Sequence, residues 1–263
     1  MKVFAKVALA AAMVVGLGAG AASADKIKFG VANEPYPPFS SADASGKWVG
    51  WEMDLMDMVC AEAKLECELV PTAWDGIIPA LNSKQIDVIW SSMSITAERK
   101  QSIDFTNMYY NSGAVLISGK TGDMDITPAH LTGKTIGVQV STIHEKYIQK
   151  HYASAGATVK TYQTQDEANN DLAAGRIDYA MADSLALDAF LQSDAGKACC
   201  ELKGLVADDK EVLGEGVGGG VRKDDTALKD QLNAAISGLA KAGKFKELNA
   251  KHGLEGKVVV PES

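Results

Sequence analysis

The chain has 263 residues, of which 46% are hydrophobic and 23% charged, with a formal net charge of −8. This length is enough for one large domain or two moderate ones, each with its own core. The acidic balance argues against a nucleic-acid partner, because such partners attract basic surfaces. It is compatible with a cationic ligand, and equally with an acidic surface that only keeps the protein soluble.

The first 24 residues have the pattern of a signal peptide. Lys2 and Lys6 supply positive charge, residues 7–22 form a small-apolar run, and Ala22-Ser23-Ala24 fits a cleavage site. There is no cysteine at the cut, which argues against a lipid anchor. Nothing later approaches the ~18 apolar residues of a membrane helix. We therefore expect an exported, soluble protein that begins at Asp25 and is not inserted in a membrane.

The four cysteines allow three pairings in an oxidising compartment. Cys60 ends a helical stretch and Cys67 enters the next strand, so a bond between them closes a small loop easily and would stabilise the fold by roughly 2–3 kcal/mol. Cys199 and Cys200 are neighbours. A bond between them would strain the peptide, and a reduced pair or an intermolecular bridge are the alternatives. No metal site is expected, because neither the cysteines nor the four histidines have ligand spacing.

Strand and helix patterns alternate through the first third of the mature chain. Strands are predicted at 27–31, 67–70 and 86–90, and helices at 52–63 and 74–83, where Pro79 must sit near the helix start. Turn-rich segments occupy 33–39 and 46–50. This alternation is typical of a mostly parallel sheet.

Residues 91–99, SSMSITAER, follow the third strand. Thr96 has the character of a helix N-cap, which places Arg99 in the first turn, where the helix dipole disfavours a cation. A cation in that position, beside three hydroxyls and free helix N–H groups, indicates an anion-binding site. The alternative is a surface arginine on a capped helix.

The second half of the chain repeats the first. Residues 136–138 match 29–31 as a first strand and precede a polar loop, and 172–178, LAAGRID, resemble 81–87, LNSKQID. The sixth residue after the isoleucine is Ser92 in one copy and Asp183 in the other. Each half therefore presents a polar group from the end of an equivalent strand, where open α/β sheets bind ligands.

Two crossings between these halves are predicted. The extended run 114–117 would lead into the second half, and a segment near 205–211 would lead back. Helices at 225–241 and 245–252 then complete the first half. We expect lobe 1 to comprise 25–113 and 212–263, and lobe 2 to comprise 114–211. The glycines at 214–220 lack phosphate-loop spacing.

In these motifs the mature chain resembles a family 3 periplasmic solute-binding protein of a polar amino-acid ABC importer, and most of all the lysine/arginine/ornithine- and histidine-binding type. The motifs are EPYPPF (34–39), GWEMDL (50–55), WDGIIPAL (74–81), SSMSITAER (91–99), DFT (104–106), GRID (175–178) and GVRK (220–223). Trp51 and the adjacent cysteines depart from the family pattern. The resemblance implies an α/β, two-lobed periplasmic-binding-protein fold (type II) with two strand hinges and a ligand cleft between the lobes.

The resemblance also assigns ligand contacts. Arg99 would hold the α-carboxylate, helped by Ser94 and by Ser141-Thr142 of the other lobe. Asp183 would pair with the α-ammonium. The remaining implied contacts are Ser92 to the ammonium, Tyr36 and Trp74 on either side of the ligand side chain, and Ser91 and Gln139 in the lining. A zwitterion needs one fixed cation and one fixed anion desolvated together, which Arg99 and Asp183 would supply only when the cleft shuts.

The preferred ligand is a basic amino acid (arginine, lysine, ornithine or histidine). An acid near the first turn would meet the distal cation, and Asn33 or Glu34 occupies that place, with Glu52 able to assist. Arg99 is the only Lys or Arg in the pocket segments, so an acidic ligand side chain would lack a counter-ion. A neutral polar ligand, glutamine or cystine, is the alternative.

Rival functions are an enzyme similar to cyclohexadienyl dehydratases, in which Glu34 or Glu52 would be the acid, and a receptor ectodomain. No nucleophile–base arrangement supports catalysis, and we expect no catalytic residue and no cofactor. The expected partners are a free amino acid and an inner-membrane ABC permease with its cytoplasmic ATPase. The expected location is the periplasm and the expected state a monomer.

Overall fold

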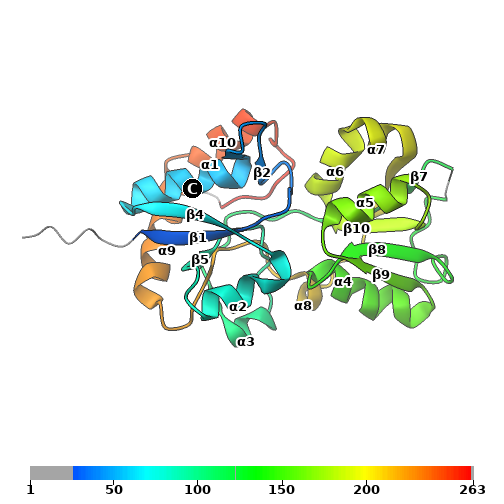
Figure 1. Cartoon of the computed structure of the whole chain (residues 1–263), viewed down its shortest axis with the longest axis horizontal. Coiled ribbons are helices and arrows are strands. Elements are labelled where there is room, and N and C mark those ends of the chain that lie inside the picture. Colours follow the sequence, from blue (N-terminus) through cyan, green and yellow to red (C-terminus); the bar gives the residue numbers. More distant parts are fainter. Residues whose placement is uncertain (1–25, 122, 262–263) are drawn as a thin grey trace, which may run out of the picture.

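The structure is a computed structural model that describes residues 26–121 and 123–261. It has two α/β lobes side by side, joined by extended segments (Figure 1). The signal peptide expected at 1–24 lies outside the described residues. Among the helices of the described residues, none combines the length and the apolar character needed to cross a bilayer.

The first lobe is built on a five-stranded sheet in the order β4-β1-β5-β12-β6. Its strands are β1 Ile27–Ala32, β4 Cys67–Thr72, β5 Val88–Ile89, β6 Asp104–Phe105 and β12 Gly220–Val221, with a small hairpin of β2 Ser41–Ala42 and β3 Trp48–Val49. Its helices are α1 Trp51–Ala63, a 3₁₀ turn at Trp74–Gly76, α2 Ile77–Asn82, α3 Arg99–Ser102, α9 Thr226–Lys241 and α10 Lys244–His252.

The second lobe has a five-stranded sheet in the order β11-β7-β10-β8-β9. Its strands are β7 Ala114–Gly119, β8 Thr135–Gln139, β9 Thr158–Tyr162, β10 Tyr179–Asp183 and β11 Cys200–Leu205. Its helices are α4 Ile143–Tyr147, which continues as a π-helix at Ile148–Tyr152 and a 3₁₀ turn at Ala153–Ala155, then α5 Gln165–Ala173, α6 Ser184–Gln192, α7 Asp194–Cys199 and α8 Lys210–Leu213.

The two sheets share one plan, as the sequence repeat predicted. In each, a central strand (β1 or β8) lies between two parallel neighbours (β4 and β5, or β9 and β10), and the next strand (β12 or β7) is added antiparallel. The expectation of a mostly parallel sheet is confirmed: β1, β4 and β5 are parallel, and in each sheet four of the five strands run in one direction, while one strand, β12 or β7, runs against its two neighbours. The antiparallel strand of each sheet comes soon after a crossing: β7 follows the first crossing and β12 follows the second.

Both faces of each sheet are buried under helices. In β10, Tyr179 and Met181 belong to the core that includes α4, whereas Ala180 and Ala182 belong to the core that includes α5 and α6. This alternation follows from the two-residue period of a strand, and it explains why such strands are apolar throughout. In lobe 1 the same alternation places Val88 against α1 and α9 and Ile89 against α2.

Two disulfides are present. The Cys60–Cys67 bond joins the last turn of α1 to the start of β4, as predicted. Cys199 and Cys200 are bonded to each other at the junction of α7 and β11.

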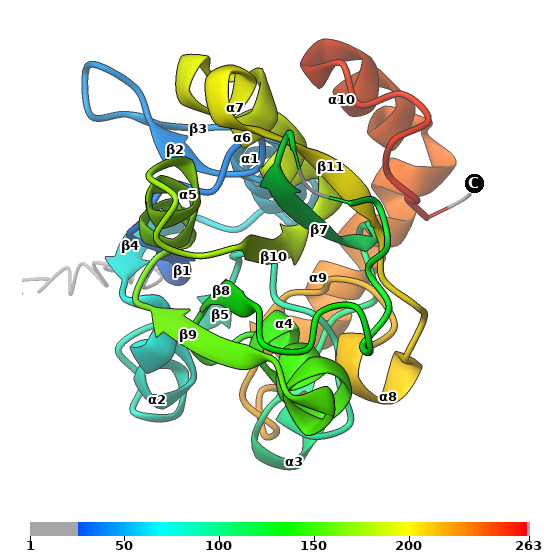
Figure 2. The same cartoon turned by 90° about the vertical axis from the view of Figure 1, so that its right-hand side faces the viewer.

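The crossing segments differ in part from the prediction. Residues 114–117 were expected to cross between lobes, but they lie in β7, inside the second sheet. The crossing comes just before them, since Asn111 still pairs with Val259 of lobe 1 and the carbonyl of Gly113 already accepts from Ser184 N of lobe 2. Figure 2 looks onto lobe 2 and shows α8, on the return crossing, beside α4.

Candidate ligand-binding site

A cavity lined by residues of both lobes lies between them. Lobe 1 contributes Ala32, Glu34, Tyr36, Trp74, Ser91, Ser92, Ser94 and Arg99, and lobe 2 contributes Gln139, Thr142, Ile143, His144, Gln165 and Asp183. Every predicted site residue except Ser141 and Glu52 is in this lining.

The ends of two equivalent strands supply much of this wall. Ser91 and Ser92 follow β5, and Asp183 is the last residue of β10. Ser91 Oγ accepts from Ala32 N at 2.9 Å and so joins this strand end to the end of β1. Ser92 has a left-handed backbone, with φ of 51°. The strand ends meet at the cavity because the two lobes share one topology and face each other.

Glu52 has a supporting position instead of the predicted contact with a ligand. Its carboxylate accepts from Ser92 N at 2.7 Å and Ser92 Oγ at 2.8 Å, and the hydroxyl of Tyr109 donates to it as well. Burial raises the pKa of Glu52, while these three donors act in the opposite direction. The predicted assistance to a distal cation is therefore wrong, because Glu52 holds the backbone of Ser92 in place from behind the cavity wall.

Arg99 begins α3, which is only four residues long. The helix therefore starts later than predicted, although Thr96 Oγ1 still accepts from Arg99 N at 3.2 Å. Nη1 of Arg99 donates to the carbonyl of Ser94 at 3.0 Å, and the guanidinium carbon lies 5.5 Å from the centre of the Trp74 ring. Burial lowers the pKa of Arg99 to about 10, so the group stays protonated at neutral pH.

Ser141 contributes its backbone to the site. Its carbonyl accepts from Nη2 of Arg99 at 3.4 Å, across the two lobes. Its N–H is occupied by Glu145 Oε2, and its side chain is exposed. Its neighbour Thr142 lines the cavity and accepts from Glu145 N as the N-cap of α4.

Asp183 approaches from lobe 2. It is 9% exposed, and its Oδ2 accepts a hydrogen bond of 2.7 Å from the hydroxyl of Tyr36 in lobe 1. The imidazole Nε2 of His144 lies 3.5 Å from Oδ1. Arg99 and Asp183, one from each lobe, thus face one cavity.

Glu34 supplies a second carboxylate to the cavity. It is half-buried and accepts from Gln139 Nε2 at 2.9 Å, which is another contact between the lobes. Burial raises its pKa, against several hydrogen bonds that lower it. Asn33, the alternative first-turn residue, is exposed and outside the lining. Of the two, only Glu34 is placed to meet a ligand.

Sequence reasoning missed four lining residues: Ala32, Ile143, His144 and Gln165. Ile143 and His144 directly follow the polar loop that was identified, so their position after Thr142 was a usable signal. Gln165 begins α5 after a capping box formed by Thr164 and Glu167, whose sequence pattern was also visible. Within the described ranges, no group of three or more acidic, His or Cys side chains is arranged to hold a metal ion.

Comparison with known proteins agrees with this geometry. The family model for bacterial extracellular solute-binding proteins, family 3, matches residues 27–255. The L-arginine-binding protein of Pseudomonas aeruginosa is 41% identical over 232 residues, covering 88% of this chain and 89% of that protein. The lysine/arginine/ornithine-binding periplasmic protein of Escherichia coli is 36% identical over 249 residues, covering 93% and 95%.

A solved structure is similar over the same extent. An ancestral arginine-binding protein bound to arginine superposes with a TM-score of 0.78 at 31% identity, covering 86% of this chain and 97% of that one. These relatives are solute-binding proteins and not enzymes. The chain belongs to the family 3 bacterial extracellular solute-binding proteins.

Proposed function

We propose that this chain is the periplasmic substrate-binding component of an amino-acid ABC importer and that it captures a basic amino acid by cleft closure. One observation carries the proposal. Arg99, Asp183 and Glu34 line the same cavity, a set that complements one carboxylate and two cationic groups. Two relatives support this ligand class by their names: one is an L-arginine-binding protein, and the other is a lysine/arginine/ornithine-binding protein.

The α-carboxylate of the ligand is assigned to Arg99. A guanidinium has five N–H donors in a planar fork, and the contacts to Ser94 and Ser141 leave others free for a bidentate carboxylate. The α-ammonium is assigned to Asp183 and Ser92. Because an unpaired charge in a cavity is costly, each end of the zwitterion stabilises the protein group that it meets.

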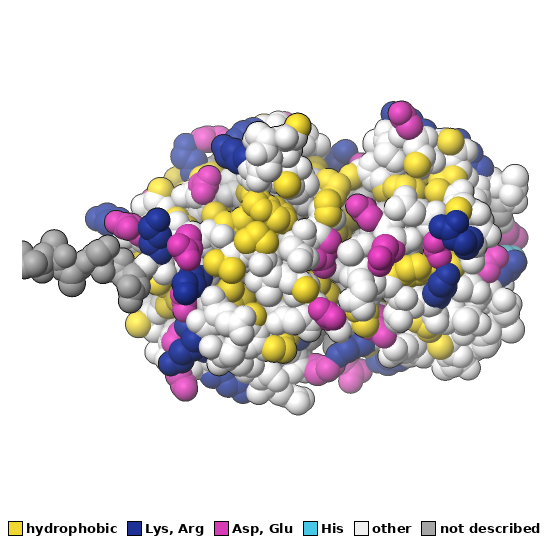
Figure 3. Space-filling model, in the orientation of Figure 1, with side chains coloured by type: hydrophobic (Ala, Val, Ile, Leu, Met, Phe, Trp, Pro, Cys, Tyr) yellow, Lys and Arg dark blue, Asp and Glu magenta, His cyan; other side chains and the backbone are white. Residues whose placement is uncertain are grey.

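The side chain of the ligand is assigned to the space between Tyr36, Trp74 and Glu34. The two aromatic rings offer apolar contact along the aliphatic part, and the Glu34 carboxylate offers a counter-ion for the distal cation. A cation there would favour the ionised form of Glu34, offsetting the effect of burial on its pKa. Several acidic side chains also lie near the junction of the lobes on the face shown in Figure 3, which favours the approach of cations.

Closure is proposed to occur about two short segments. The first is 112–113, between the last pairing to lobe 1 at Asn111 and the first contact with lobe 2 at Gly113. The second is Gly214. The residue after it, Glu215, donates its N–H to the carbonyl of Ile95 in lobe 1.

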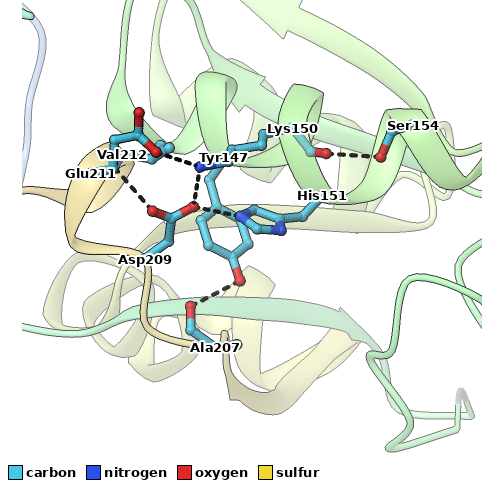
Figure 4. Close-up of polar contacts among 8 residues, drawn as sticks. All are labelled: Tyr147, Lys150, His151, Ser154, Ala207, Asp209, Glu211 and Val212. Atoms are coloured by element: carbon cyan, nitrogen blue, oxygen red, sulfur yellow. Dashed lines mark hydrogen bonds and ion pairs between the residues drawn. The ribbon is translucent and has the colours of Figure 1, made fainter.

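The residues before Gly214 are held by lobe 2, as Figure 4 shows. Asp209 contacts Lys150 Nζ at 2.9 Å and His151 Nε2 at 2.7 Å, and the hydroxyl of Tyr147 donates to the carbonyl of Ala207 at 2.9 Å. We therefore place the second lobe boundary at 213/214, two residues beyond the 211/212 boundary expected from the sequence.

In this role the protein would act in the periplasm as a monomer and deliver its ligand to an inner-membrane permease powered by a cytoplasmic ATPase. The enzymatic alternative, a dehydratase on the same fold, would need a cavity carboxylic acid. Glu34 is the candidate, since burial raises its pKa. Turnover of prephenate without tight binding of any amino acid would favour this alternative.

The test is a thermal-shift screen of the twenty amino acids and ornithine, followed by calorimetry of those that raise the melting temperature. Arginine, lysine, ornithine or histidine is expected to give the largest shift and the lowest Kd. The proposal is contradicted if glutamine or cystine binds while none of the basic amino acids does.

A further inference from the structure

His144 is a buried imidazole in the cavity wall to which neither the predicted site nor the proposed function gives a role. It is the second residue of α4, and its side chain is 6% exposed. Its Nε2 has no hydrogen-bond partner among the described residues. Asp183 Oδ1 lies 3.5 Å from this atom, within ion-pair range but without hydrogen-bond geometry.

The two oxygens of Asp183 have different surroundings. Oδ2 is occupied by the hydroxyl of Tyr36, whereas Oδ1 faces His144 Nε2. A ligand ammonium that pairs with Asp183 must therefore approach beside the imidazole. When the imidazole is neutral, the Asp183 carboxylate is free to pair with the ligand's ammonium. An imidazolium places a second cation against the same carboxylate and repels the ammonium.

The other titratable groups of the cavity can be separated from His144 by the pH at which they act. Burial raises the pKa of Tyr36 well above its usual value and lowers that of Arg99 only to about 10, so neither changes charge between pH 5 and 8. Glu34 faces the cavity and Glu52 lies behind Ser92, and burial raises the pKa of both. Glu34 is therefore the group in the lining that a pH experiment must distinguish from His144.

We propose that His144 is a positioning residue that makes capture of the ligand's α-ammonium by Asp183 depend on a proton: neutral His144 permits the pairing, and protonated His144 opposes it. This inference rests on the proposed function. Because coupling between two binding events is reciprocal, the bound ligand must also oppose protonation of His144. Acidification would weaken binding, whatever the side chain of the amino acid.

The test is calorimetry with arginine, whose groups keep their charges between pH 5.5 and 7.5. For the wild type we expect the Kd to rise about tenfold from pH 7.5 to 5.5, because an imidazolium at His144 would repel the ligand's α-ammonium. His130→Gln, a matched change at a surface histidine paired with Asp123 and Asp125, should keep this ratio. His144→Gln should reduce the ratio of the Kd at pH 5.5 to the Kd at pH 7.5 to less than about threefold. Glu34→Gln should keep the wild-type ratio even if overall affinity falls.

NMR of the histidine rings gives a second measurement that does not depend on how the variant folds. Saturating arginine should lower the titration midpoint of His144, because the coupling between ligand and proton is reciprocal. The inference is overturned if that midpoint does not move, or if Glu34→Gln and not His144→Gln removes the pH dependence. Tight binding with a flat pH profile would defeat this inference alone. Failure to bind any amino acid at pH 7.5 would defeat the proposed function as well.

Discussion

The hydroxyl of Tyr36 in lobe 1 donates a 2.7 Å hydrogen bond to Oδ2 of Asp183 in lobe 2. Tyr36 therefore both lines the cavity and joins the lobes. The contacts of Gln139 with Glu34, of Arg99 with the carbonyl of Ser141, and of Lys146 with Glu98 cross the same gap. Ligand contacts and closing contacts thus share residues, so binding and closure are expected to be coupled.

Removing that hydroxyl tests the coupling. Tyr36→Phe keeps the ring but loses a hydrogen bond to a carboxylate, which contributes about 1–2 kcal/mol, so ligand affinity should fall roughly 5- to 30-fold. Tyr162→Phe is the matched control, since its hydroxyl donates to Asp171 at 2.6 Å within lobe 2. Calorimetry should show the loss only in the Tyr36 variant. Equal affinities for the two variants would mean that the contact between lobes does not contribute to binding.

A methyl group at Gly214 should impair closure. Gly214 has φ of 84° and ψ of −165°, a conformation that is essentially restricted to glycine and costs other residues about 1–3 kcal/mol. A Cβ there would also lie 2.4 Å from the carbonyl oxygen of Ile95. Gly214→Ala should therefore lower both the melting temperature and ligand affinity.

Gly133→Ala is the control for Gly214→Ala. Gly133 has φ of 77°, but no atom lies within 4 Å of the added Cβ. This variant should lose stability and keep its affinity. If Gly214→Ala also keeps wild-type affinity, Gly214 is not a hinge.

Acid should weaken the attachment of the return crossing to lobe 2. Hydrogen bonds from Lys150 and then from His151 lower the pKa of Asp209 to about 2. Because the folded-state pKa lies below the ordinary value of 3.8, the stabilisation is complete above about pH 4 and is lost as the pH falls toward 2. Asp209→Asn should lower the melting temperature at pH 7 by about 2–4 °C. The difference in melting temperature between this variant and the wild type should become smaller between pH 4 and 3, where Asp209 begins to be protonated in the wild type.

Glu211 provides the comparison for Asp209. It contacts the same Lys150 Nζ at the same 2.9 Å, but its side chain is 82% exposed. Exposed ion pairs contribute little, so Glu211→Gln should leave the melting temperature nearly unchanged. An equal effect of the two substitutions would contradict the assigned role of Asp209.

The Cys60–Cys67 disulfide should stabilise lobe 1 without affecting the ligand. Its two cysteines are seven positions apart. Closing so short a loop lowers the conformational entropy of the unfolded chain, which stabilises the fold by about 2–3 kcal/mol. The double variant Cys60→Ala/Cys67→Ala should unfold at lower denaturant concentration, by urea titration followed with circular dichroism, and should bind the ligand with wild-type affinity. Unchanged unfolding would show that the bond contributes nothing to stability.

Sequence reasoning identified residues of the cavity lining where the signal was local or repeated. The loop ending at Arg99 carries its own cap and hydroxyls, and the internal repeat pointed to Asp183 because the same strand end exists in both lobes. The Cys60–Cys67 pairing followed from a helix end and a strand start that were both legible. Each of these inferences needed only neighbouring residues or a comparison of two similar segments.

It failed where a side chain's partners are distant in the chain. Glu52 has the sequence context of a helix start, but its position is set by donors 40 and 57 residues away, on Ser92 and Tyr109. His144 was passed over because the carboxylate that it faces, Asp183, lies on another element. The antiparallel strand β12 is only two residues long, too short to show periodicity.

The central claim is that Arg99 and Asp183 hold the two ends of one zwitterion. A thermodynamic cycle tests it by removing a residue and, separately, the ligand group that this residue would bind. Calorimetry would compare arginine with agmatine, which lacks the α-carboxylate, in the wild type and in Arg99→Ala. The wild type should bind agmatine about a hundredfold more weakly, and Arg99→Ala should bind both with similar affinity. The same comparison for Asp183 uses 5-guanidinopentanoic acid, which lacks the α-ammonium. The wild type should bind it more weakly than arginine, and Asp183→Asn should bind both with similar affinity. If Arg99→Ala still prefers arginine to agmatine as strongly as the wild type does, the account is contradicted.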